Sequence, residues 1–294
     1  MPDAIGNKTA HDYHLDVPAP EQAFFAKGLG HGDWGAKNRL SHLFNPKSGN
    51  TVMLAFDHGY IMGATAGLER MDVTIAPLCR YADVLMATRG AIRSCIPPTV
   101  HNAICLRATH DASVLIDDMS TGNGVGADME AAIRMNASAV AIQCFIGGAG
   151  EARSLETLCR AVDAGERYGI PVLGVTAVGK EMARTTQYFL LATRMLAELG
   201  ASFVKTYYCD NFEEVVAACP VPIVVAGGKK LPEDEALTLA YRSIQGGARG
   251  LDMGRNIFQS NHPVEMAKAI RMIVHQKATD KEAYEFYTDA IHTK

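Results

Sequence analysis

A lysine interrupts the apolar and aromatic stretch from Phe203 to Tyr208, whose composition is typical of a β-strand. Partial removal of Lys205 from water favours its neutral amine, which is a nucleophile. Such an amine can condense with a ketone to an iminium, an electron sink for breaking or making the adjacent carbon–carbon bond. The other interpretation is a side chain that extends to solvent or pairs with Asp57.

Further polar residues end apolar runs or share the face of the lysine. Asp57 could orient the amine of Lys205, cap the following turn or transfer protons, and we favour proton transfer. His58 points to the opposite face of an extended strand, which is more typical of a structural histidine. Lys180 and Tyr207 are possible pocket residues. A solvated lysine at the rim is an equally ordinary interpretation of Lys180, whereas an aromatic residue at the position of Tyr207 more often serves packing.

Two glycine-containing segments indicate an anion site. VVAGGKK contains Gly227 and Gly228, and DMGRN contains Gly254 and Arg255. Glycines let backbone N–H groups approach a phosphate, and the arginine adds a charge-assisted contact. These glycines could also serve only to make tight turns, but the presence of both segments favours phosphate.

The fold that must position these residues is predicted to be α/β. Nearly continuous apolar runs are typical of parallel strands covered on both faces, and helical segments lie between them. About eight such units in roughly 250 residues predict a (β/α)8 TIM barrel with an N-terminal extension. A doubly wound open sheet is the alternative, but no G-x-G-x-x-G turn follows the first strand. The predicted strands begin at Thr51, Asp83, Ala103, Ala139, Pro171, Ser202, Pro222 and Gly250.

The predicted organisation is an arm with a short helix over residues 1–50, then the barrel with its C-terminal helices over residues 51–294. The helix is expected over AKNRLSHLF (36–44), and Pro263 is expected to begin a terminal helix. No linker indicates a second domain.

Composition excludes several classes of protein. The chain of 294 residues has a net charge of −4 and no dense basic segment, which argues against nucleic acid or an anionic membrane as the main partner. No apolar run reaches the length that a membrane span needs, and the N-terminal segment lacks the apolar core of a secretory leader, so we expect a cytoplasmic protein. The seven dispersed cysteines indicate reduced thiols; Cys209 could carry an acyl group only if its thiol were activated. No metal-ligand cluster is visible, and none is needed if an iminium is the electron sink.

Four segments in this order, AFDHG, KTYY, VAGGKK and DMGRNIFQ, resemble the archaeal-type class I aldolases, often called the DhnA family. The resemblance implies that Lys205 is the Schiff-base lysine, that Asp57 is an active-site acid, and that Gly227, Gly228, Gly254 and Arg255 bind phosphate. Aldolases of the family carry a tyrosine acid/base after the fifth strand, where this chain has Ala177.

Within that family, the chain is most similar to members that are thiolases. This similarity implies acetyl transfer from a phosphorylated dione of autoinducer-2 breakdown to coenzyme A, a co-substrate, with no tightly bound cofactor. It also implies self-association into a homo-oligomer, perhaps a decamer. The alternatives are a Schiff-base aldolase that cleaves a sugar phosphate without coenzyme A, and a barrel that only binds a phosphorylated ligand.

Overall fold

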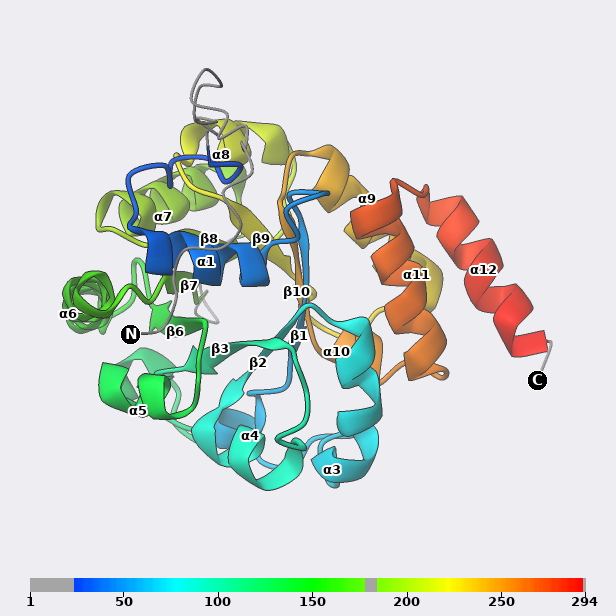
Figure 1. Cartoon of the computed structure of the whole chain (residues 1–294), viewed down its shortest axis with the longest axis horizontal. Helices are drawn as coiled ribbons and strands as arrows, with labels where there is room; N and C mark the ends of the chain where they lie inside the picture. Colours follow the sequence, from blue (N-terminus) through cyan, green and yellow to red (C-terminus); the bar gives the residue numbers. More distant parts are fainter. Residues whose placement is uncertain (1–23, 178–183, 293–294) are drawn as a thin grey trace, which may run out of the picture.

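Eight parallel strands close into a barrel in the computed structural model, which describes residues 24–177 and 184–292 (Figure 1). The order around the barrel is β1-β10-β9-β8-β7-β6-β3-β2. This closure confirms the predicted fold and excludes the open sheet. The strands are β1 (Thr51–Ala55), β2 (Val84–Thr88), β3 (Ala103–Arg107), β6 (Ala139–Cys144), β7 (Val172–Thr176), β8 (Phe203–Thr206), β9 (Ile223–Ala226) and β10 (Gly250–Met253).

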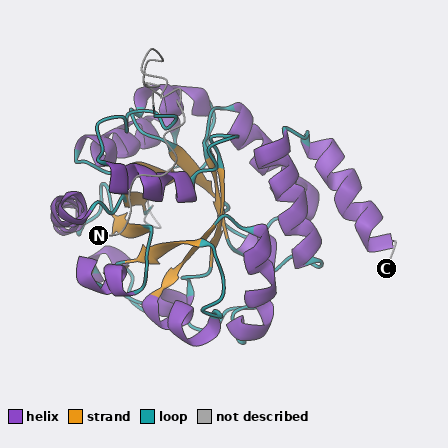
Figure 2. Ribbon diagram, in the orientation of Figure 1, coloured by secondary structure: helices purple, strands orange, loops and turns teal. Residues whose placement is uncertain are grey.

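Helices surround the strands, as Figure 2 shows. They cover the outer face of the barrel, which explains why its strands are apolar on both faces. The α-helices are α1 (Trp34–Leu43), α2 (Gly59–Met62), α3 (Met71–Thr74), α4 (Arg89–Cys95), α5 (Met129–Arg134), α6 (Glu151–Tyr168), α7 (Thr186–Glu198), α8 (Phe212–Ala218), α9 (Glu233–Gln245), α10 (Arg255–Phe258), α11 (Pro263–Gln276) and α12 (Asp280–His292). Two 3-10 helices are η1 (Ala76–Tyr81) and η2 (Met119–Gly122).

Local sequence sets several helix ends. Asp33 accepts a hydrogen bond from the N–H of Ala36 at 2.7 Å and so caps the start of α1. Gly169 ends α6 in the left-handed region, at φ 65°, where a side chain would be strained. The predicted start of α11 at Pro263 is confirmed.

Helix α1 covers the amino-terminal ends of the strands. The ring of Phe44 meets that of Phe203, at the start of β8, edge to face with centroids 5.4 Å apart. Nη1 of Arg39 donates to the carbonyl of Gly169, just before β7, at 3.0 Å. Burial of an aromatic side chain contributes about 2 kcal/mol to the stability of the fold. The packing of α1 and Phe44 therefore closes this end of the barrel.

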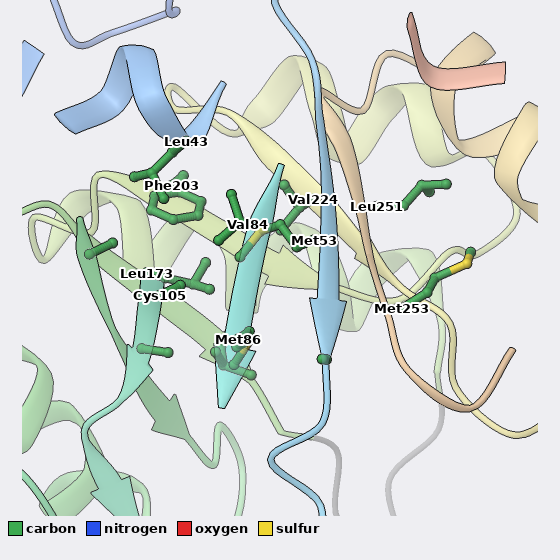
Figure 3. Packing of buried hydrophobic residues seen from close by; sticks show 14 of the residues in the cluster. Leu43, Met53, Val84, Met86, Cys105, Leu173, Phe203, Val224, Leu251 and Met253 are labelled. Atoms are coloured by element: carbon green, nitrogen blue, oxygen red, sulfur yellow. The ribbon is translucent and has the colours of Figure 1, made fainter. Parts of the chain in front are cut away.

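The barrel interior is packed with side chains. Figure 3 shows Met53, Val84 and Val224 inside the ring, whereas Leu251 and Met253 lie on the other side of β10, toward the outer helices. Because side chains alternate along a strand, Asp252 lies on the inner face between those two outward residues. The polar site therefore rests on an apolar floor.

One small feature was not expected from the sequence. A two-stranded antiparallel sheet, β4 (Thr109–His110) and β5 (Gly124–Val125), lies between β3 and β6. Helix α12 packs beside α11 and α9 as a separate element and carries the C-terminus (Figure 1). None of the helices in the described ranges has both the length and the apolar character to cross a membrane.

Candidate active site

Lys205 lies inside the barrel, on β8. Its backbone is in register with Val175 of β7 and Val224 of β9, and its side chain is 12% exposed. The amine lies 3.7 Å from the sulfur of Met86 on β2. A lysine held this deep has few hydrating waters. Its amine lies inside the barrel, between β8 and the opposite strand β2.

The acid that contacts this amine is Asp252, which our sequence analysis did not single out. Its Oδ2 lies 2.8 Å from Nζ of Lys205, and its side chain is fully buried. Burial raises the pKa of Asp252 above its ordinary value; the charge of Lys205 opposes that rise and the charge of Asp57 adds to it. The alternative that Lys205 pairs with Asp57 therefore does not describe this structure.

Asp57 is instead held by Arg107, at the end of β3. Both Nε and Nη2 of the arginine lie 2.7 Å from Oδ2 of the aspartate, and both residues are buried. Burial alone would raise the pKa of Asp57, but Arg107, with smaller contributions from His58 and Lys205, lowers it to about 2. Asp57, just after β1, is therefore a fixed anion that lies within electrostatic range of the Lys205 amine.

His58 lies at the rim, with Nδ1 4.0 Å from Oδ1 of Asp57. Burial lowers the pKa of His58 to about 4; Asp57 opposes this shift, whereas Lys205, Arg255 and Arg107 add to it. The imidazole is thus neutral near pH 7. Its edge lies against Gly254, where a β-carbon would come within 2.8 Å of Cε1.

A second buried network adjoins Arg107. The hydroxyl of Tyr60 donates to Oδ2 of Asp111, and Nδ2 of Asn123 donates to Oδ1 of the same carboxylate at 2.7 Å. Burial raises the pKa of Tyr60, so its hydroxyl stays protonated. Nη1 of Arg107 is buried and has no hydrogen-bond partner among the described residues, which leaves one donor for another ligand.

The two glycine segments predicted to bind phosphate lie together. Asn256, fully buried at the start of α10, donates from Nδ2 to the carbonyl of Gly227 and accepts from the N–H of Leu231, both at 2.8 Å. This one side chain ties the loop after β9 to the loop after β10. Gly254 lies so close to β1 that a β-carbon would be 2.2 Å from the carbonyl oxygen of Ala55.

An additional cation, Arg184, reaches the same loops. Its guanidinium stacks 4.0 Å from the ring centroid of Tyr207, and both residues border Gly228, whose φ of 69° favours glycine. Nε of Arg255 is buried without a hydrogen-bond partner among the described residues. Glycine backbone and two guanidinium groups thus gather at one edge of the mouth, which is the arrangement that an anion requires.

The remaining candidates are less informative. Lys180 lies outside the described residues. Cys209 is buried, and burial raises the pKa of its thiol, which argues against a reactive thiolate. In the described ranges, no three His, Cys, Asp or Glu side chains are grouped to hold a metal ion. A hollow of about 1030 Å³ between α1 and the amino-terminal ends of β2 and β3 is lined by none of the candidate site residues described in this subsection.

The profile of the DeoC/LacD family aldolases matches residues 51–260, which is most of the chain. The chain is 51% identical, over 288 residues, to the 3-hydroxy-5-phosphonooxypentane-2,4-dione thiolase of Escherichia coli K12, covering 98% of each sequence. It is equally identical, over 290 residues, to an uncharacterized aldolase of Pasteurella multocida, covering 98% of this chain and 99% of the relative.

Among solved structures, the barrel is similar to an archaeal fructose-1,6-bisphosphate aldolase in which the catalytic lysine is covalently bound to the carbinolamine intermediate of the substrate. The TM-score is 0.72 at 23% identity, over 82% of this chain and 99% of that one. At this identity the likeness concerns the fold.

Proposed function

Because the chain belongs to the DeoC/LacD family of aldolases, we propose that it is a thiolase that transfers the acetyl group of 3-hydroxy-5-phosphonooxypentane-2,4-dione to coenzyme A. The products are acetyl-coenzyme A and dihydroxyacetone phosphate. The observation that carries the proposal is the amine of Lys205, held inside the barrel mouth beside two buried carboxylates. A lysine with no covalent role would not need this costly position.

The reaction uses Lys205 as an electron sink. Its amine condenses with C4 of the dione, the carbonyl next to the phosphorylated carbon, and water leaves. The coenzyme A thiolate then attacks C2, the C2–C3 bond breaks, and its electron pair moves into the iminium to give an enamine. Protonation at C3 and hydrolysis release dihydroxyacetone phosphate and return the amine. No residue is required to deprotonate the substrate hydroxyl, which fits Ala177 at the position where the family's aldolases carry tyrosine.

The phosphate binds at the loops that Asn256 ties together. Backbone groups of Gly227, Gly228 and Gly254 approach its oxygens, and Arg255 neutralises its charge. Binding here fixes the distance between the phosphate and the reacting carbonyl, so only a phosphorylated dione brings C4 to the amine.

The other polar residues prepare the site for this chemistry. Asp57 supplies a fixed negative charge near Lys205 and stabilises the cationic iminium. His58 lines the rim as a neutral imidazole, and Tyr207 forms a wall on which Arg184 stacks.

We also infer that the protein acts in the cytoplasm and associates with copies of itself. All seven cysteines are free, which fits a reducing compartment that also contains coenzyme A. Trp34 on α1 is 79% exposed, and a large exposed aromatic residue is typical of an interface. Sedimentation of the wild type and of Trp34→Ser tests the association. If the variant forms an assembly of the same mass as the wild type, Trp34 is not required at the interface.

The test of the function has two stages. Borohydride treatment with dihydroxyacetone phosphate, followed by peptide mass spectrometry, is expected to label Lys205. Cleavage of the dione is then measured with and without coenzyme A, and acetyl-coenzyme A should appear only with the thiol. An aldehyde product formed equally well without coenzyme A would indicate an aldolase. Retained phosphate binding with no adduct would indicate a barrel that only binds its ligand.

A further inference from the structure

We infer that Asp252 is the acid–base catalyst for imine formation and hydrolysis at Lys205. The inference rests on the proposed Schiff-base function and adds the residue that moves its protons. The carboxylate of Asp252 touches the reacting atom, with Oδ2 2.8 Å from Nζ. Strands β8 and β10 both flank β9, and their inward side chains meet across it.

Asp57 is less suited to this task, although it also lies within electrostatic range of the amine. Its Oδ2 is occupied by two nitrogens of Arg107, so protonation would leave a buried guanidinium without its counter-ion. Oδ1 of Asp252, by contrast, is buried and has no hydrogen-bond partner among the described residues. Protonation of Asp252 therefore does not break an ion pair with an arginine.

The charged and titratable groups around Asp252 come from three strands. Lys205 lies on β8, Asp57 follows β1, and Arg107 and Cys105 lie on β3. Two cations thus face two carboxylates, and a single proton can move between Nζ and Oδ2 while the total charge of the group is conserved. Burial raises the pKa of Asp252, so a proton is held more readily at its carboxylate than at an exposed one.

The proton transfers balance at each step. Asp252 takes a proton from the ammonium of Lys205, and the neutral amine attacks the ketone, so that an N–C bond forms and the C–O π bond opens. A proton passes from the attacking nitrogen to the oxygen, which gives the carbinolamine. The acid of Asp252 then protonates the hydroxyl, the C–O bond breaks, and water leaves. The product is an iminium beside a carboxylate, which also acts as its counter-ion; hydrolysis runs the same steps in reverse.

The experiment measures the rate at which dihydroxyacetone phosphate becomes trapped on Lys205 by borohydride. Asp252→Asn is expected to slow trapping about 100-fold or more, the usual contribution of a positioned acid–base group, while the affinity for inorganic phosphate stays unchanged. Asp57→Asn is the comparison and should slow trapping by less. Equal rates for wild type and Asp252→Asn would overturn the inference.

A second variant separates proton transfer from a structural role. Asp252→Ala leaves space for a small acid. Formate should therefore raise the trapping rate of this variant at least about tenfold, whereas chloride at equal ionic strength should not. Slow trapping that formate does not change would reduce Asp252 to a positioning counter-ion and overturn the inference. Absence of any adduct in the wild type would instead remove the Schiff base, and the proposed function would fail with it.

Discussion

Arg107 directs two nitrogens, Nε and Nη2, at a single oxygen of Asp57, each at 2.7 Å. The two residues are 5% and 6% exposed, so neither charge is shared with bulk water. Loss of one partner leaves the other ionised and buried, which costs more than the pair contributes. Replacing one residue of this pair therefore measures how much the buried ion pair matters for the stability of the fold.

Arg107→Met is expected to lower the free energy of unfolding at pH 7 by about 3 to 5 kcal/mol, because the Asp57 carboxylate becomes unpaired. Adding Asp57→Asn in the same chain should recover part of this loss, since no buried charge then remains. Denaturant unfolding of both single variants and the double variant measures the coupling. A loss below about 1 kcal/mol in Arg107→Met would contradict a tight pair.

The pKa of His58 predicts a pH dependence of stability. It is lowered from 6.5 to about 4 in the folded protein, so between these values the unfolded chain binds a proton that the folded chain does not. Stability should therefore fall as the pH falls through this window, by about 2 kcal/mol after allowance for a side chain that is 23% exposed.

The control for this prediction is His58→Gln, which does not titrate. Its stability should lack that part of the pH dependence, measured as the difference from the wild type at each pH. The difference isolates His58, because Asp252, whose pKa burial raises, contributes a change of the opposite sign in both proteins. Parallel curves between pH 6.5 and 4 would refute the assignment.

Gly254→Ala is expected to destabilise the barrel by about 2 to 4 kcal/mol, because its β-carbon would lie 2.2 Å from the carbonyl oxygen of Ala55 and the backbone would have to shift. Gly90→Ala, in the first turn of α4, is the matched control, since outside its own helix and chain neighbours no atom of the described residues lies within 4 Å of its β-carbon. The control should be neutral or slightly stabilising in thermal unfolding. Similar losses in both variants would show that close approach at Gly254 is not the cause.

Arg184→Ala should raise the KM for the phosphorylated dione about tenfold and change kcat little, because one charge-assisted contact to the phosphate is lost. Arg194→Ala, on the exposed side of α7, removes an arginine whose partners among the described residues are Glu198 and the carbonyl oxygen of Ala218 at the surface, and it should leave KM unchanged. Initial rates over a range of substrate concentrations check both. Equal KM values for wild type and Arg184→Ala would place Arg184 outside the phosphate site.

Ala177→Tyr is expected to lower the rate of acetyl-coenzyme A formation at least tenfold, because the ring would fill space that the thiol must enter. The backbone at this position is held by a 2.8 Å hydrogen bond from the N–H of Ala177 to the carbonyl oxygen of Cys144, which restrains the chain from moving the ring aside. Trapping at Lys205 should persist. Ala177→Ser is the control, and unchanged thiolysis in the tyrosine variant would mean that coenzyme A enters elsewhere.

Much of the fold was predictable because its signals are local. A strand covered on both faces must be apolar along its whole length, and each of the eight runs proved to be a barrel strand. The short pair β4 and β5 gave no such signal, since two residues on each side cannot form a periodic pattern. Helix α12 was ambiguous because α11 ends only a few residues before it.

The site was predictable only in part. Lys205 is conspicuous as a charge within an apolar strand, and Asp252 carries the same signal, but its partner could not be assigned before the strands were placed. The contact joins β8 to β10 across β9, which is a property of barrel closure. Arg184 lies beyond any strand, and its stack on Tyr207 depends on the path of the intervening chain.

The seam between β1 and β10 determines when the protein can become a barrel during its synthesis. Thr51 is in register with Gly250, and Leu54 with Met253. At ribosomal rates of about 5 to 20 residues per second, one edge of β1 waits roughly 10 to 40 seconds for its neighbour. Throughout that interval the nascent sheet has an open edge that another chain could join. A chain whose synthesis ends before Gly250 therefore keeps an open sheet edge at which it can aggregate, and it lacks the acid beside Lys205.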